Sequence, residues 1–159
     1  MSNISFDNAN VAGFGKIFFV PRNHTTPSLP DMNMIVLKVD NVYQAICIDI
    51  ELDAVGDNLQ EACNNLKRTL RAYTSQMLSN YNGDTKAVAQ DIVNAAFSQG
   101  DLKSQLFSMY LQAKQKYLVD KIVKKHRVKS KAEDFINAMQ RIFQIEPIRF
   151  NLTLTAGLT

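Results

Sequence analysis

The chain has 159 residues, of which 46% are hydrophobic, and a formal net charge of +3 at pH 7. A chain of this length buries roughly 70% of its unfolded surface around one core, so we expect a single domain spanning residues 1–159. No stretch approaches the ~18 apolar residues that cross a bilayer, and the N-terminal residues carry neither a basic start nor an apolar signal core. The sequence therefore favours a cytoplasmic protein without a membrane partner. Its modest charge does not by itself indicate a nucleic-acid partner.

Three strands are predicted in the N-terminal third of the chain. The apolar run GKIFFV, at residues 15–20, has the length and composition of a strand, and a proline-rich loop follows it at residues 21–33. Residues 34–39 and 42–50 are predicted to form two strands joined by a tight Asp-Asn turn, because both turn residues tolerate left-handed backbone angles. The last strand is expected to bury one face, which carries Ile46, Ile48 and Ile50.

A long amphipathic helix is predicted next, and its start has a clear local signal. Gly56 and Asp57 break the strand pattern, and Asn58 is a good N-cap. Glu61 is placed to bond back to the backbone N–H of Asn58, as in a capping box. Apolar residues then recur at spacings of three and four as far as Leu78, so we expect one face of this helix to lie on the sheet.

Residues 34–78 resemble the strand, turn and helix of HicB-like antitoxins. The resemblance is carried by Tyr43-Gln-Ala45, by Ile50-Glu-Leu52 and by the run VGDNLQEA that follows. Members of that family commonly show Gly-Asp-Thr-x-Glu-Glu-Ala at this point. Here Asn58 stands in place of the threonine and Gln60 in place of one glutamate, and both replacements keep a polar cap and a helix start.

The resemblance implies a β-β-β-α unit over residues 14–82 and a non-catalytic role. HicB-like antitoxins neutralise a small ribonuclease toxin by covering it, so the implied partner is a small basic toxin-like protein. They usually also carry a ribbon-helix-helix or helix-turn-helix unit for DNA. No such unit is recognised in residues 84–159, so operator binding does not follow from the resemblance.

The second half of the chain, residues 84–146, is predicted to be helical. Asp84 or Thr85 caps a helix that stops at Gln99-Gly100, and Asp101 caps a third helix that runs to about residue 127. The third helix is long enough to project past a small sheet, and its expected apolar stripe comprises Leu102, Leu106, Met109, Tyr110, Ala113, Tyr117, Ile122 and Val123.

A fourth helix and a closing strand are predicted at the end of the chain. The helix opens with the capping box Ser130-Lys-Ala-Glu133 and ends before Pro147. Its apolar residues are Phe135, Ile136, Met139, Ile142 and Phe143. Residues 147–156 follow, and the run IRFNLTLT within them alternates strictly between apolar and polar side chains. An isolated strand is not stable, so this one is expected to return to the sheet or to pair with another subunit.

Asp49, Glu51 and Asp53 form an acidic run at the end of the predicted third strand. At alternate positions of an extended strand they would share one face, which is the arrangement that divalent cations need in two-metal phosphodiester chemistry. The HicB-like fold also resembles a reduced ribonuclease H fold, in which acidic residues on strands hold Mg²⁺. One hypothesis is therefore a metal-dependent nucleic-acid-processing enzyme with these residues as metal ligands. The simpler interpretation is a solvated strand end.

A basic cluster lies between residues 121 and 131, where seven of the eleven positions are Lys, Arg or His. Its Lys and Arg residues are Lys121, Lys124, Lys125, Arg127, Lys129 and Lys131. Such density suits nucleic acid or another anionic partner, because each phosphate contact releases a counterion. Cations are also favoured at a helix C-terminus, and the cluster lacks interleaved aromatic residues for base stacking. The solvated helix end is therefore the simpler interpretation.

Cys47 and Cys63 are not spaced as a metal-binding pair, and each lies in an apolar setting, so we expect buried free thiols. The sequence has no glycine-rich phosphate loop, and no cofactor is expected.

The predicted fold is α+β: a small antiparallel sheet with one helix packed across it, a helical second half and a C-terminal strand that returns to the sheet. The favoured function is a non-catalytic interaction protein similar to the HicB-like antitoxins, and we also expect a homodimer. The metal-dependent enzyme is the second hypothesis, and the third is a purely structural subunit of a homodimer. The third hypothesis predicts exposed aromatic side chains on residues 102–118.

Overall fold

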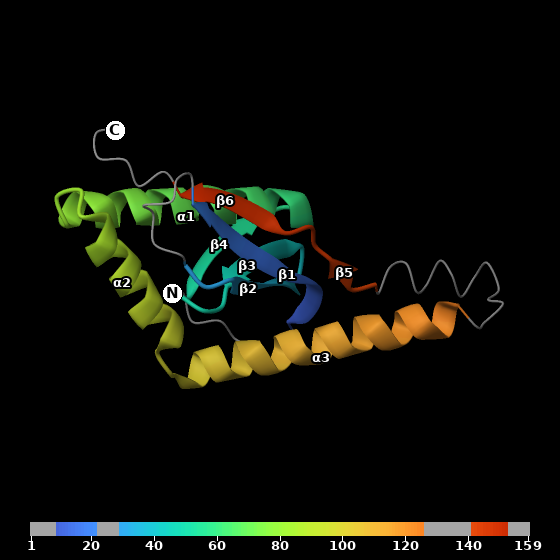
Figure 1. Cartoon of the computed structure of the whole chain (residues 1–159). Coiled ribbons are helices and arrows are strands. Elements are labelled where there is room, and N and C mark those ends of the chain that lie inside the picture. The colour runs from blue at the N-terminus through green and yellow to red at the C-terminus, as the bar shows by residue number, and fades with distance from the viewer. Residues whose placement is uncertain (1–8, 22–28, 126–140, 153–159) are drawn as a thin grey trace.

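The structure, a computed structural model, describes residues 9–21, 29–125 and 141–152. The fold is α+β, as predicted, with a curled sheet between helices (Figure 1). The strands are β1 (Asn10–Pro21), β2 (Met32–Val39), β3 (Val42–Cys47), β4 (Leu52–Gly56), β5 (Phe143–Gln144) and β6 (Ile148–Leu152). The helices are α1 (Leu59–Asn80), α2 (Thr85–Phe97) and α3 (Asp101–Lys124).

The sheet is built around β1, which pairs with strands from both ends of the chain. The strand order is β4-β3-β2-β1-β5, and β6 also pairs with β1. The first four strands are antiparallel, and the predicted tight turn between β2 and β3 is confirmed by the left-handed φ of 54° at Asp40. β5 and β6 both run parallel to β1, with Ile17 opposite Ile148. The predicted return of the closing strand to the sheet is thus confirmed.

The chain bends earlier than predicted at the end of β3. The strand ends at Cys47 rather than at residue 50, and residues 48–51 form a turn in which Glu51 has a left-handed φ of 55°. β4 follows this turn as a further strand that the sequence pattern did not indicate. The first strand is also longer than predicted, since β1 begins at Asn10 rather than at residue 15.

Both faces of the sheet are buried under helices, one under α1 and α2 and the other under α3. Side chains of α1 and α2 pack on one face, where the core includes Met34, Val36, Ala45, Cys47, Leu66, Leu70, Val88 and Ile92. α3 covers the other face, where the core includes Phe14, Ile35, Leu37, Ile46, Ile48, Leu106, Tyr110 and Ala113. The predicted burial of Ile46 and Ile48 is confirmed, although it is α3 that covers them. Ile50 packs on the α1 side instead, because the turn after Cys47 redirects it.

The predicted start of α1 is confirmed with one change of partner. Asn58 Oδ1 accepts a hydrogen bond from the Glu61 backbone N–H at 2.8 Å, as an N-cap should. Glu61 Oε2 accepts from the backbone N–H of Asp57 at 3.0 Å, one residue before the expected donor. At the other end, Asn82 and Gly83 take the left-handed conformation, and Gly83 N–H donates to Leu78 O at 2.9 Å.

The helices of the second half begin close to the predicted residues. Asp84 caps α2, with its carboxylate accepting from the backbone N–H groups of Lys86 and Ala87. Gly100 rather than Asp101 is the N-cap of α3, and α3 ends at Lys124, three residues before the predicted end. Among the helices of the described residues, none has an apolar stretch of the length that a membrane-spanning segment needs.

Most of the predicted fourth helix, which opens at Ser130 and ends before Pro147, lies outside the described residues, because they omit residues 126–140. Phe143 was predicted in that helix but belongs to β5, because it lies opposite Gly13 of β1 in a parallel pairing. The helix therefore cannot extend as far as Phe143.

Candidate functional site

The acidic run does not form one strand face. Asp49 and Glu51 lie in the turn between β3 and β4, and Asp53 lies on β4. Asp49 Oδ2 accepts from the backbone N–H of Asn33 at 2.6 Å, whereas Asp53 Oδ2 accepts from Gln44 Nε2 at 2.7 Å. Within the residues that the structure describes, no three His, Cys, Asp or Glu side chains are grouped so that they could hold a metal ion. The shared face on which the metal-site hypothesis depended is therefore missing.

Asp49 is half-buried, and charged side chains of both β1 and α3 act on its carboxyl group. Burial raises the pKa of its carboxyl above the ordinary value, against the opposing effects of the Asn33 hydrogen bond and of the positive charges of Lys103 and Lys16. Burial, with a smaller contribution from the charge of Asp49, also raises the pKa of the Tyr110 hydroxyl. The hydrogen bond from Asn33 of β2 to the Asp49 carboxylate links the turn after β3 to the neighbouring strand.

Lys103 is a buried lysine that the sequence analysis did not single out. Its side chain is 5% exposed, and its Nζ donates to Ala95 O and Ser98 O, both at 2.9 Å. Longer bonds reach Ala96 O at 3.4 Å and Ser98 Oγ at 3.3 Å. The ammonium thus caps the C-terminus of α2, where the helix dipole favours a cation. The sequence did hold a signal for this burial. Lys103 lies three residues before Leu106 and seven before Tyr110, a spacing that places it on the buried face of α3.

The described part of the basic cluster lies at the exposed end of α3. Lys121, Lys124 and Lys125 are all exposed, and Lys121 Nζ lies 5.9 Å from the centroid of the Tyr117 ring. The remaining predicted members, Arg127, Lys129 and Lys131, lie outside the described residues.

The C-terminal half of α3 extends past the strands of the sheet (Figure 1). Its last buried residue is Ala113, and Tyr117 makes an edge-to-face contact with Phe14 at 5.5 Å between ring centroids. Leu111 is 60% exposed and Ile122 is 61% exposed. We call the exposed apolar side chains from residue 111 onward the α3 stripe, which comprises Leu111, Leu118, Val119, Ile122 and Val123.

The α3 stripe differs from the apolar stripe that the sequence predicted. Leu106, Tyr110 and Ala113 face the sheet as predicted, but Ile122 and Val123 are exposed, because α3 continues beyond the sheet. The aromatic residues between 102 and 118 contact the sheet-side core, so they do not supply the aromatic surface expected of a structural homodimer.

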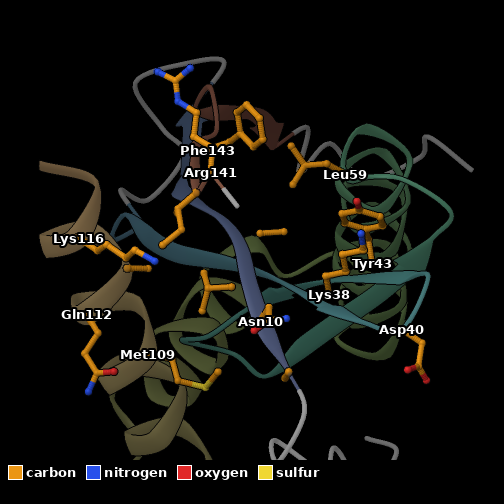
Figure 2. A pocket seen from close by; sticks show the side chains of 15 residues that line it. Asn10, Lys38, Asp40, Tyr43, Leu59, Met109, Gln112, Lys116, Arg141 and Phe143 are labelled. Carbon is orange, nitrogen blue, oxygen red and sulfur yellow. The ribbon is translucent and has the colours of Figure 1, made fainter. Parts of the chain in front are cut away.

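A wide groove of about 1120 Å³ lies over the first residues of β1, between the β2–β3 turn and α3. Figure 2 shows Lys116 and Gln112 on one side of β1 and Lys38 and Tyr43 on the other. Lys38 Nζ lies 5.3 Å from the centroid of the Tyr43 ring. The lining carries three cationic side chains and one acidic side chain, which are Lys38, Lys116, Arg141 and Asp40. The groove therefore adds to the positive charge around α3.

Comparison with models of protein families, with curated proteins and with solved structures found no match to this chain. The resemblance of residues 34–78 to HicB-like antitoxins thus stays a prediction.

Proposed function

We propose that this chain is a non-catalytic protein-binding module and that the α3 stripe is its binding surface. The observation that carries the proposal is the row of exposed apolar side chains on α3, four of which lie on the part of the helix that follows its last buried residue, Ala113. Exposed apolar patches cost free energy in a monomer and mark interaction sites when they are contiguous. A rigid helix presents such a patch without further ordering of the chain, which favours binding.

The chemistry of the described residues supports binding over catalysis. Burial raises the pKa of Cys47 to about 12 and that of Cys63 to about 11, so neither thiol is a ready nucleophile. Asp49 and Asp53, two of the three hypothesised metal ligands, are engaged in separate hydrogen bonds of the sheet.

An antitoxin-like role is a narrower form of this proposal. The HicB-like resemblance implies a small basic toxin-like partner. Such a partner is not favoured at the α3 stripe, because this half of the helix carries several lysines and one aspartate, Asp120. A toxin-like protein would therefore use another surface, and the α3 stripe would serve a different partner.

Site-specific photo-crosslinking tests the proposal. A benzophenone side chain is introduced at position 118 of the full chain in its host, and adducts are identified by mass after irradiation. The matched control carries the same group at Ser104, which is exposed on the same side of α3 two heptads earlier. We expect a discrete heterologous protein adduct from position 118 and none from position 104.

Two outcomes would overturn the proposal. Adducts of the chain with itself alone would indicate the structural homodimer, since a second copy would then cover the α3 stripe. The absence of any adduct at position 118, with the folded chain recovered intact, would mean that the stripe contacts no other protein.

A further inference from the structure

We infer that the partner of the α3 stripe is an amphipathic helix with acidic flanking residues, supplied by another protein. The inference rests on the proposed function and names the partner's chemistry. It follows from two parallel rows of side chains on α3, one apolar and one basic, and from the charge of this half of the helix.

The apolar row has the spacing of a coiled-coil seam. The row consists of Leu111, Gln115, Leu118 and Ile122, at successive spacings of four, three and four residues. Gln115 is its polar member. These spacings place the four residues on one line along the helix, in the positions that a second helix packs against. The row extends roughly 16 Å at 1.5 Å per residue, which is about three turns of contact for a partner helix.

The basic row borders the apolar row on one side. Lys114 and Lys121 lie three residues after Leu111 and Leu118 and are both exposed, and the exposed Lys125 takes the next position of the seam itself after Ile122. Residues three apart are neighbours on a helix surface, so the first two lysines form an edge along the seam. In the coiled-coil arrangement, Lys114 and Lys121 occupy the flanking positions whose charge selects the partner. Glutamate or aspartate at the facing positions of the partner helix would complement them.

A second copy of this chain does not supply that complement. Between residues 111 and 125 the only acidic side chain is Asp120, and the lysines are Lys114, Lys116, Lys121, Lys124 and Lys125. Two such helices packed antiparallel would place flanking lysines against flanking lysines. Packed parallel, they would bring the two copies of Lys125 together in the seam, and like charges side by side are destabilising. Nucleic acid would satisfy the lysines but would leave the apolar row facing water. An acidic amphipathic helix satisfies both rows at once.

A pair of designed peptides tests this inference. Each has about three heptads with leucine at both seam positions, and the flanking positions carry glutamate in one peptide and lysine in the other. Binding of the labelled peptides to the full chain is followed by fluorescence anisotropy. We expect the acidic peptide to bind at least about tenfold more tightly than the basic peptide, because several exposed charge pairs change from repulsion to attraction.

Three variants identify the surface. Lys114→Glu with Lys121→Glu should reverse the preference between the two peptides, and Leu118→Ser with Ile122→Ser should abolish binding of both. The matched control, Arg71→Glu with Lys86→Glu, changes the net charge equally at exposed positions of α1 and α2 and should bind as the wild type does.

Four results would overturn the inference. The first is equal binding of the two peptides, and the second is an equal loss with the control variant. The third is a wild type that runs at twice its mass of 17.9 kDa while the serine variant is monomeric, since a second copy would then cover the stripe. The fourth is retention of a single-stranded RNA of about 20 nucleotides that depends on the lysines but not on Leu118 and Ile122. Failure of the peptides together with a heterologous adduct at position 118 would reject only the acidic helix and leave the binding role standing.

Discussion

Replacing Lys103 with methionine should destabilise the fold, because the ammonium of Lys103 caps the last turn of α2 from inside the protein. The substitution keeps an unbranched, mainly apolar side chain in the same space, so it creates little cavity. It removes the bonds to Ala95 O and Ser98 O, both at 2.9 Å, and the weaker bonds to Ala96 O and Ser98 Oγ. It also removes a cation from the negative end of the helix dipole.

The size of the effect follows from these bonds. Each short hydrogen bond from a charged donor contributes about 1.5–3 kcal/mol, and the cation at the helix end adds about 1 kcal/mol. The variant no longer buries an ammonium, and this offsets part of the loss. We expect a net decrease of about 2–4 kcal/mol in the free energy of unfolding, which lowers Tm by about 5–15 °C for a domain of this size.

Urea unfolding followed by circular dichroism measures this decrease directly. Lys114→Met is the matched control, since Lys114 is exposed on the same helix, and its free energy of unfolding should change by less than about 0.5 kcal/mol. Equal stability of the two methionine variants would refute the assignment of Lys103 as a buried helix cap.

Other parts of the fold give further expected outcomes. Burial raises the pKa of Asp49 above its ordinary value of 3.8, so the folded chain holds this proton more tightly than the unfolded chain. The free energy of unfolding then falls as pH rises through and above that ordinary value, and Asp49→Asn should gain stability relative to the wild type over the same rise in pH, as measured by urea midpoints. Gly56→Ala should lose about 2 kcal/mol or more in thermal melts, because the new Cβ would lie 2.5 Å from a backbone nitrogen of α1. Cys47 and Cys63 are buried thiols with raised pKa values, so they should react with a thiol reagent at about pH 8 only after unfolding in urea.

Each of these outcomes has a control or a contrary result. A Cβ at Gly100 would meet no atom within 4 Å, so Gly100→Ala should lose only the small N-cap preference for glycine over alanine, clearly less than Gly56→Ala loses. A stability difference between Asp49→Asn and the wild type that does not vary with pH would contradict the raised pKa of Asp49. Labelling of the native chain as fast as that of the unfolded chain would show that the thiols are accessible to solvent.

Local signals in the sequence were enough to predict the fold class and several element ends. The cap at Asn58, the left-handed residues Asn82 and Gly83, and the alternating closing strand are each set by side chains close in sequence, and the structure confirms them. The free thiols of Cys47 and Cys63 are also buried, as predicted from their apolar settings.

Features that depend on distant contacts could not be predicted from the same patterns. β1 begins before its apolar run, in a segment that includes Gly13. A Cβ at Gly13 would lie 2.9 Å from the side chain of Ile145, so a residue far along the chain creates the need for a glycine there. The burial of Lys103 depends on how α3 meets the end of α2. Ile122 fits the periodicity of a buried stripe, and only the extent of the sheet decides that it is exposed.

The central position of β1 means that the sheet cannot be completed until late in the synthesis of the chain. Its antiparallel neighbour β2 follows soon after it, but its parallel neighbour β6 comes from the far end of the described chain, with Ile17 opposite Ile148. One hydrogen-bonding edge of an apolar strand therefore stays open on the ribosome until β6 has emerged, and open edges of this kind recruit strands from other chains. Pairing across such a separation also carries a large loop-closure cost and is slow. We expect nascent chains that stop short of β5 to depend on chaperones far more than the completed chain does.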